Sequence, residues 1–277
     1  MLLAIEVGNT NVKFGVYETD GSAAGTLVHS WRSVTDRRQT GDELAAMVDG
    51  VLRINGIARP AIKRVVIASV VPPLYRALSE LSTRYFGCSG EFISAARQSL
   101  MPVLTARPTE LGADLIAGAI GAVEKYGAPL VVVGFGTATT FAAIDAQGRY
   151  AGTAIAPGVE ISVDALVSRA AKLFDVPLVL PPAAIGTDTT TSLQSGIIYG
   201  FVGQAEYLIG RIAAELGGPK LTVIATGGLA ELIAPYTKAI DRVDQRLVLD
   251  GIYHWAMTDR AASDSTDGSM GSTKGKG

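Results

Sequence analysis

Two short glycine turns, far apart in the sequence, have the composition of phosphate-binding turns. Gly8-Asn9-Thr10 follows an apolar run at residues 3–7, and Gly136-Thr137 follows an apolar run at residues 130–133. Such a turn exposes backbone N–H groups, and the Thr hydroxyl adds a further donor, so a small anion-binding concavity results. Each turn alone is equally typical of a plain hairpin. The pair of them favours phosphate binding.

Two carboxylates stand where they could take part in phosphoryl transfer. Glu6 directly precedes the first turn, a position from which it could support a metal-bound triphosphate; the alternative is a carboxylate near solvent. Asp114 opens an apolar helix. It could take a proton from a substrate hydroxyl as a general base, or it could simply stabilise the helix N-terminus through the helix dipole.

A third glycine turn follows a third apolar run. The run at residues 221–225 leads into Thr226-Gly227-Gly228. Because glycine has no Cβ, backbone at such a turn can approach a ligand closely. We expect this turn to lie against a nucleotide base or ribose.

The elements that position these turns follow from hydrophobic periodicity and from glycine and proline punctuation. The sequence predicts strands at residues 2–7, 12–18, 26–33, 65–70, 130–133, 139–145, 149–155 and 221–225. It predicts helices at residues 41–54, 72–86, 111–126, 158–173, 190–216 and 229–236. The fold class is therefore α/β.

The two halves of the chain resemble each other locally. With a gap of one residue, LAIEVGNTNVKFGVYETDG aligns with VVVGFGTATTFAAIDAQG, which places Glu6 on Gly134, Gly8 on Gly136, Thr10 on Thr137 and Gly21 on Gly148. Repeated strand-turn-strand units of this kind favour a duplicated domain with a cleft between the copies. Chance similarity between apolar hairpins is the alternative.

The composition excludes several other classes of function. The 277 residues are 48% hydrophobic and 18% charged, with a net charge of −2, which gives no general attraction to nucleic acid or anionic membranes. The single Cys88 excludes an internal disulfide and is interpreted as a structural thiol. Neither His29 nor His254 belongs to a metal or nucleophile motif.

No membrane span or signal peptide is predicted, so we expect a cytoplasmic protein. Residues 261–277 are Gly/Ser-rich and are predicted to be a disordered tail.

Over residues 1–256 the sequence resembles the type III pantothenate kinases of the actin/hexokinase/sugar-kinase-like superfamily. The motifs that carry the resemblance are EVGNTNVKFG, SVVPPL, LGADLIAGAIGAVEKYG, FGTATTF, GTAIAPGVEISVDALVSRAAKL, IGTDTTTSLQSGIIYGF and VIATGGLAELI. The resemblance implies two actin-like (ribonuclease H-like) halves, each with a central mixed sheet, at residues 1–110 and 111–260. It also implies phosphorylation of pantothenate to 4'-phosphopantothenate by Mg-ATP, the first step of coenzyme A biosynthesis, a monovalent cation (K⁺ or NH₄⁺), and a homodimer.

The resemblance also assigns roles residue by residue. Asp114 matches the proton acceptor, and Glu6 lies on the Mg-ATP side. The residues expected to bind ATP are Glu6, Val7, Gly8, Asn9, Thr10, Asn11, Val12, Lys13, Thr137, Gly227 and Gly228. Those expected to contact pantothenate are Gly112, Ala113, Asp114, Leu115 and Thr189.

Four positions depart from the family pattern. Glu6 replaces an Asp, Gly134 replaces the Asp that binds the monovalent cation, Leu115 replaces an Arg that holds the substrate, and Thr105 replaces a Tyr. Arg107 is close in sequence and is a candidate to substitute for the missing Arg. These departures leave open two alternatives to the pantothenate kinase: a non-catalytic binding or regulatory paralogue, and a kinase for another small alcohol.

Overall fold

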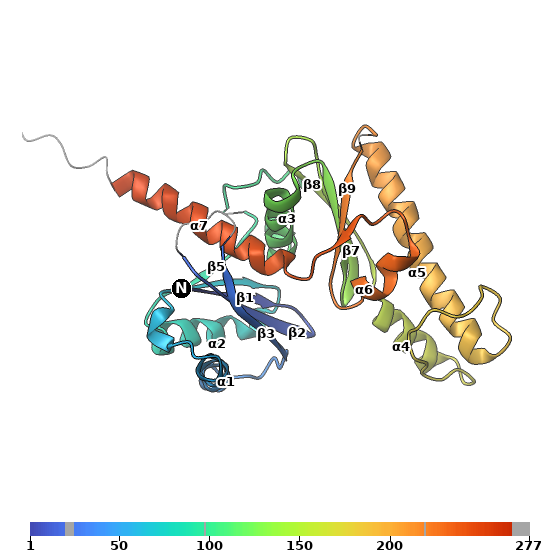
Figure 1. The fold of residues 1–277 in the computed structure, drawn as a ribbon, viewed down its shortest axis with the longest axis horizontal. Coiled ribbons are helices and arrows are strands. Elements are labelled where there is room, and N and C mark those ends of the chain that lie inside the picture. Colours follow the sequence, from blue (N-terminus) through green and yellow to red (C-terminus); the bar gives the residue numbers. More distant parts are fainter. Residues whose placement is uncertain (20–24, 97, 219, 268–277) are drawn as a thin grey trace, which may run out of the picture. The chain divides into compact units, whose positions relative to one another are not determined.

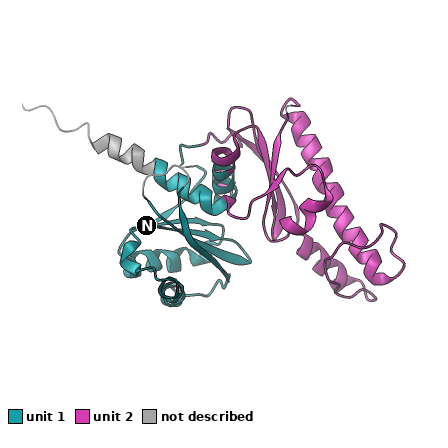
Figure 2. Ribbon diagram, viewed as in Figure 1, with its two compact units in different colours: residues 1–100, 111–121, 248–277 teal, residues 101–110, 122–247 magenta. Residues whose placement is uncertain are grey.

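The computed structural model describes residues 1–19, 25–96, 98–218 and 220–267, without the side chains of 259–267. The chain forms two compact units (Figure 2). Unit 1 comprises residues 1–100, 111–121 and 248–277, and unit 2 comprises residues 101–110 and 122–247. The two expected halves, divided at residue 110, are each continuous in sequence, whereas each of these units is made of more than one segment. Gly21, which the alignment places on Gly148, lies outside the described residues.

Unit 1 is built on a five-stranded mixed sheet in the order β3-β2-β1-β4-β5. Figure 1 labels four of these strands, β1, β2, β3 and β5. Its strands are β1 (Leu2–Val7), β2 (Asn11–Tyr17), β3 (Leu27–Val34), β4 (Arg64–Ser69) and β5 (Gly90–Phe92). The first three strands pair antiparallel, and β4 and β5 continue the sheet in parallel from β1. The short edge strand β5 was not predicted.

One face of this sheet packs on helices. Ile5, Val7 and Phe14 belong to a buried core with residues of α1 (Gly41–Ile54) and α2 (Tyr75–Glu80). The remaining helical turns of this region are η1 (Arg59–Ala61), η2 (Pro72–Leu74) and the π-helical turn η3 (Leu81–Tyr85). The helix predicted at residues 72–86 is thus η2, α2 and η3 in succession.

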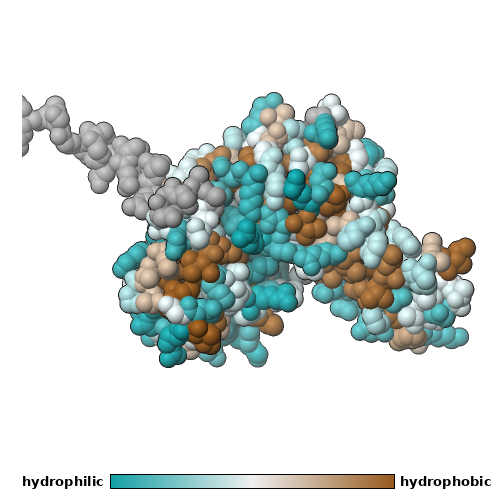
Figure 3. Space-filling model, viewed as in Figure 1, coloured by the Kyte–Doolittle hydropathy of each residue, from teal (hydrophilic) through white to brown (hydrophobic). Residues whose placement is uncertain are grey.

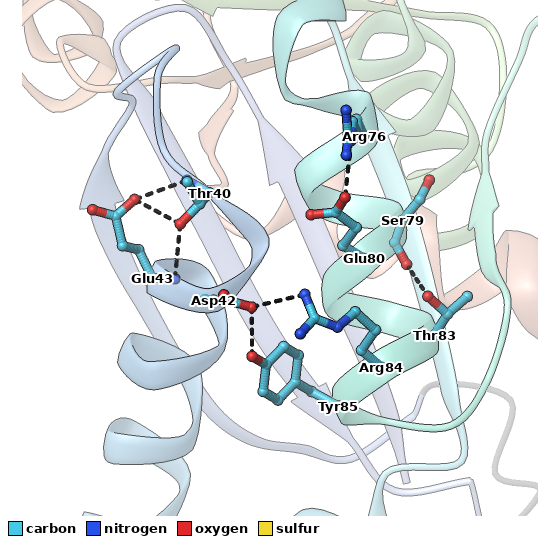
Figure 4. A network of polar contacts seen from close by, with 9 residues as sticks. All are labelled: Thr40, Asp42, Glu43, Arg76, Ser79, Glu80, Thr83, Arg84 and Tyr85. Atoms are coloured by element: carbon cyan, nitrogen blue, oxygen red, sulfur yellow. Dashed lines mark hydrogen bonds and ion pairs between the residues drawn. The ribbon is translucent and has the colours of Figure 1, made fainter.

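Polar contacts fix the start of α1 and its link to η3 (Figure 4). Thr40 and Glu43 form a capping box, in which each side chain binds the other residue's backbone N–H. The Asp42 carboxylate accepts from Arg84 at 3.0 Å and from Tyr85 at 2.6 Å. This network has a structural role, because it provides hydrogen-bond partners for backbone N–H groups at the start of α1 and joins α1 to η3.

The other face of the sheet packs on the C-terminal helix α7 (Leu247–Asp267), which was not predicted. Successive strand residues point to opposite faces, so Gly15 and Tyr17 face away from Phe14. The Tyr17 hydroxyl donates to Asp250 of α7 at 2.6 Å, and its ring stacks on Tyr253. Helix α7 continues to Asp267 and so includes residues 261–267 of the expected tail; residues 268–277 lie outside the described residues.

The helix α3 (Ala113–Tyr126) begins in unit 1 and crosses α7 there at close range. A Cβ added at Gly251 of α7 would overlap the carbonyl group of Ala117 in α3. A Cβ added at Gly118, one residue further along α3, would lie 3.5 Å from Val248 Cγ2. Glycine at position 251 therefore permits the two helix backbones to touch.

Unit 2 repeats the topology of unit 1. Its sheet has the order β10-β9-β6-β7-β8, with the same antiparallel and parallel pairings. The strands are β6 (Leu130–Phe135), β7 (Ala138–Ile144), β8 (Tyr150–Pro157), β9 (Thr222–Thr226) and β10 (Arg242–Val243). The burial patterns of β1 and β6 are identical, and so are those of β2 and β7. The predicted duplication is confirmed, and Glu6 and Gly134 occupy equivalent places in it.

The core of unit 2 lies between its sheet and the long helix α5 (Thr189–Glu215). The Asp188 carboxylate caps α5 by accepting from the Thr191 N–H at 2.9 Å. The other helical elements are α4 (Val159–Arg169), α6 (Ala230–Ile233), and the turns η4 (Pro108–Glu110) and η5 (Ala234–Tyr236). Within the described residues, no helix combines the length and the hydropathy that a membrane crossing requires.

Candidate active site

The first predicted phosphate turn closes the β1–β2 hairpin of unit 1. The Gly8 N–H donates to the Asn11 carbonyl at 3.0 Å, and Asn9 and Thr10 are exposed at its tip. Thr35, beyond β3, supports the turn from the side. Its hydroxyl donates to the Gly8 carbonyl at 2.7 Å, and its N–H donates to the Thr10 carbonyl at 2.9 Å. Sequence reasoning missed this support, because the contact joins residues that are distant along the chain.

The Val7 and Val12 side chains, which flank the turn, are buried in the unit 1 core. Of the predicted ATP-binding segment, these two residues can therefore offer a ligand only their backbone. The accessible groups of the segment are those of the turn itself, together with Glu6 and Lys13 on the opposite face of the sheet.

Glu6 and Lys13 form a cross-strand ion pair beside the turn. They are directly paired in the β1–β2 register, and the Lys13 Nζ lies 3.2 Å from Oε1 and 3.1 Å from Oε2 of Glu6. The Glu6 side chain is only 14% exposed. Its burial raises the pKa of Glu6, the Lys13 charge and hydrogen bond partly lower it again, and the Asp114 charge adds a smaller rise.

Asp114 lies in the first turn of α3, within the same electrostatic cluster. Its Oδ1 accepts from the Leu115 N–H at 2.8 Å. Burial raises the pKa of Asp114, and this rise is partly offset by backbone hydrogen bonds and by the Lys13 charge. A carboxylate with a raised pKa is a stronger base than an ordinary Asp, so the position suits proton abstraction. Lys13 thus acts electrostatically on both carboxylates.

Gly112 makes room for the Asp114 carboxylate. A Cβ at position 112 would lie 2.5 Å from Asp114 Oδ1 and 3.3 Å from Val70 Cγ1. The Gly112 carbonyl also accepts from the Ile116 N–H at 3.2 Å, as the first bond of the helix. Any larger residue here would displace the carboxylate. Neighbouring Ala113 is buried.

The second predicted phosphate turn closes the β6–β7 hairpin of unit 2. The Gly136 N–H donates to the Ala138 carbonyl at 3.1 Å, so the turn is one residue shorter than the first, as the alignment gap predicts. Gly158, at the N-terminus of α4, packs its backbone against this turn. A Cβ at position 158 would overlap the carbonyl oxygens of Gly136 and Thr137.

Gly134 stands opposite Thr140 in the β6–β7 register, just as Glu6 stands opposite Lys13. A Cβ at position 134 would lie 2.6 Å from the Thr140 hydroxyl oxygen. The charged pair of unit 1 is therefore replaced in unit 2 by a glycine and a hydroxyl. No carboxylate is supplied at this position of β6.

The third predicted turn, Gly227-Gly228, lies against the end of β6. Gly227 has φ +95°, a conformation that L side chains rarely adopt, and a Cβ there would overlap the Phe135 carbonyl. The Gln245 side-chain amide donates to the Gly227 carbonyl at 3.0 Å, a support that the sequence did not reveal. Since Phe135 directly precedes Gly136, the second and third turns are neighbours within unit 2.

The remaining expected substrate residues divide between the units. Leu115 is half-buried in unit 1 beside Asp114, whereas Thr189, the exposed first residue of α5, belongs to unit 2 with Thr105 and Arg107. Arg107 already has a carboxylate partner in Glu110, at 2.9 Å.

No group of three or more His, Cys, Asp or Glu side chains gathers into a metal site in the described part of the chain. Near the first turn, Glu6 and Asp114 are the carboxylates that act on each other electrostatically. This donor set fits Mg²⁺ that is bound mainly by phosphate oxygens and water, with a carboxylate in support.

Comparison with known proteins decides the family. The family model for type III pantothenate kinase matches residues 2–211. The chain belongs to the type III pantothenate kinase family. A type III pantothenate kinase of Moorella thermoacetica is 46% identical over 91% of this chain and 97% of its own, and that of Anaeromyxobacter dehalogenans is 44% identical over the same shares.

A solved structure supports the fold. The activator of 2-hydroxyisocaproyl-CoA dehydratase from Clostridium difficile, with bound ADPNP, superposes with a TM-score of 0.51 at 13% identity, covering 99% of each chain. At that identity the likeness concerns the architecture of two duplicated α/β halves.

Proposed function

We propose that this type III pantothenate kinase family member phosphorylates pantothenate with Mg-ATP to give 4'-phosphopantothenate, the first step of coenzyme A biosynthesis. One observation carries the proposal beyond family membership: the cluster of Asp114, Lys13 and Glu6 beside the Gly8 turn. It brings a candidate base, a cation and a supporting carboxylate together at a phosphate-binding turn.

In the proposed mechanism, Asp114 accepts the proton of the pantothenate hydroxyl while that oxygen attacks the γ-phosphorus of ATP. The new O–P bond forms as the bond between the γ-phosphorus and the β–γ bridging oxygen breaks, and ADP leaves with that electron pair. Burial of Asp114 raises its pKa and so its strength as a base. The hydrogen bond from the Leu115 N–H holds the carboxylate in place.

The other predicted residues are assigned to binding. The backbone of Gly8–Asn11, the Lys13 ammonium and Thr137 bind the phosphates, and the Gly227-Gly228 turn lies at the adenosine. Gly112–Leu115 and Thr189 contact pantothenate. Glu6 would support Mg²⁺, which would supply neutralisation of phosphate charge.

The monovalent cation implied by the resemblance does not fit the residues at position 134. Gly134 supplies no side-chain oxygen, and the Thr140 hydroxyl occupies the neighbourhood of its absent Cβ. A neutral hydroxyl and backbone carbonyls form a weaker cation site than one that includes a carboxylate. The proposal therefore includes ATP and Mg²⁺ but assigns no role to K⁺ or NH₄⁺.

We further propose a homodimer that forms through α4, α5 and the segment between them. Apolar side chains gather over this part of unit 2 (Figure 3). The exposed ones are Ile161, Leu166, Phe174, Val179, Ile185, Tyr199 and Tyr207. Exposed apolar side chains gathered in this way favour an interaction site, and a second copy of the chain is the partner that the family resemblance implies. We place the enzyme in the cytoplasm, where a kinase finds ATP.

The test is a coupled ADP-release assay with pantothenate, ATP and Mg²⁺, with mass detection of 4'-phosphopantothenate. We expect the Asp114→Asn variant to lose about 10²–10⁴-fold in kcat, which is the usual contribution of a general base. Asp49→Asn, a change in a surface ion pair of α1, serves as the control and should keep the rate.

Native turnover no greater than that of Asp114→Asn would contradict the proposal and favour the non-catalytic alternative. Running the assay with pantetheine in parallel tests the other alternative. The half-buried Leu115, in place of an anion-binding Arg, is the feature that would favour a neutral alcohol. Turnover of pantetheine without turnover of pantothenate would replace the proposed substrate.

A further inference from the structure

An arginine outside the predicted ATP-binding segment lies at the first phosphate turn. Arg37 follows β3, and its Nη2 donates to the Asn9 side-chain oxygen at 3.1 Å. Both side chains are exposed. Two residues before Arg37, Thr35 makes its two hydrogen bonds to the backbone of the same turn. The segment that supports the turn thus also places a guanidinium at its tip.

The charge of Arg37 is not matched by a carboxylate. Within the described residues, Arg37 forms no ion pair, and the oxygen that it contacts belongs to a neutral amide. Its neighbour Arg38 differs, because Arg38 binds the Asp36 carboxylate through its backbone N–H at 2.9 Å and its Nε at 3.4 Å. Lys13, the other cation at the turn, is paired with Glu6. Arg37 therefore brings unneutralised positive charge to the first turn.

A guanidinium carries five N–H donors in a rigid fork that matches a phosphate group. One donor of Arg37 is held by Asn9, which fixes the side chain at the turn and leaves the other donors to face a ligand. Charge-assisted hydrogen bonds from Arg to phosphate are about twice as strong as neutral ones. An arginine in this position is suited to a polyphosphate.

We propose that Arg37 is a further nucleotide-binding residue, which binds the phosphate chain of ATP at the Gly8 turn with Asn9 holding its guanidinium. The inference rests on the proposed function, since it takes ATP to be the ligand of this turn. It adds a contact from the segment after β3 to those that the family motif supplies.

Calorimetry on the full-length chain with Mg²⁺ tests the proposal, using ATP and adenosine as separate ligands. We expect Arg37→Gln to raise the Kd for ATP roughly tenfold, as the loss of one charge-assisted contact implies, and to leave the Kd for adenosine unchanged. The Kd of Arg37→Lys for ATP should lie between that of the native chain and that of Arg37→Gln. Arg38→Gln is the matched control, because it removes the same charge one residue away, and it should bind ATP like the native chain.

Three results would overturn the proposal: native ATP affinity in Arg37→Gln, an equal weakening in Arg38→Gln, or an equal weakening for adenosine. Thermal unfolding of each variant shows whether it is folded. Failure of the proposed function can be distinguished from failure of the proposal for Arg37. A chain that binds ATP through Arg37 but does not turn over pantothenate contradicts the function alone, whereas a chain with no affinity for ATP contradicts both.

Discussion

At the scale of single residues, Asp114 combines a chemical role with a penalty in stability. Burial raises its pKa, so the folded state favours the protonated carboxyl more than the unfolded state does. Its contribution to stability is therefore fully present below the ordinary pKa of Asp, and it is lost as the pH rises through the raised pKa. At pH values above the ordinary pKa of Asp, burial of this group therefore costs the native protein stability.

Besides its loss in kcat, we expect Asp114→Asn to be more resistant to urea at neutral pH than the native chain, because the amide is uncharged and can still accept from the Leu115 N–H. The difference should disappear as the pH falls from the raised pKa to the ordinary value, where Asp114 itself becomes neutral. Urea unfolding midpoints at a series of pH values measure this. A variant that is less stable than the native chain at neutral pH would refute the electrostatic interpretation of this site.

Gly112 provides a test of carboxylate placement that leaves the charge unchanged. Gly112→Ala puts a Cβ 2.5 Å from Asp114 Oδ1, so the carboxylate must move. Since small misplacements of catalytic groups can reduce rates by about 10²-fold, we expect a loss in kcat of that order with the fold retained.

Gly118→Ala is the matched control in the same helix. Its new Cβ meets only an ordinary contact with Val248 at 3.5 Å, and alanine is favoured over glycine in a helix by up to about 1 kcal/mol. This variant should keep its rate and be at least as stable as the native chain. Equal kcat values for Gly112→Ala and Gly118→Ala would show that Gly112 does not position the base.

At the scale of elements, the crossing of α3 and α7 secures the helix that carries Asp114. We expect Gly251→Ala to destabilise unit 1 by about 1–3 kcal/mol, because the added methyl overlaps the Ala117 carbonyl and overpacked sites have penalties of that size. Denaturant unfolding provides the measurement. Gly50→Ala in α1 is the control, since a Cβ there meets nothing within 4 Å; similar stability of the two variants would exclude a tight crossing.

The parts of the fold that the sequence predicted are those encoded locally. The hairpins around Gly8 and Gly136 have alternating or continuous apolar runs bounded by turn residues, so their strands and the duplication could be recognised. The short edge strands β5 and β10 could not, because their formation depends on a neighbouring strand. The missed helix α7 does carry a signal: Leu249, Ile252, Tyr253 and Ala256 are buried at helical spacing.

The same distinction holds for the site. Glu6, Asp114 and the three glycine turns belong to contiguous motifs, so their positions could be predicted. Thr35, Arg37 and Gln245 act on those turns through contacts between residues far apart in sequence, and no local pattern marks them. Gly112 was predicted as a substrate contact, whereas the structure adds a steric reason for glycine there.

At the scale of the whole molecule, the exposed apolar surface of α4 and α5 predicts the oligomeric state. We expect Tyr207→Glu, at a residue 65% exposed on α5, to shift the protein from dimer to monomer, because a charge in an apolar interface loses its hydration without gaining a partner. Sedimentation velocity measures the shift. Ile54→Glu is the control, at an isolated residue 85% exposed at the end of α1. A native chain that sediments as a monomer would contradict the proposed interface.

The duplicated hairpins show which features survive when a repeated unit diverges. The backbone ladder and the buried positions of β1 and β6 are unchanged, whereas the half-buried slot on one face carries an acid in one copy and none in the other. The shared burial pattern indicates that packing fixes the strands, whereas the residue at this position differs between the two copies. A protein engineer who wanted to add an acid to unit 2 could place it at position 134, which has the same place in β6 that Glu6 has in β1. Of the described atoms near that glycine's absent Cβ, the Thr140 hydroxyl is the one that would have to rotate away.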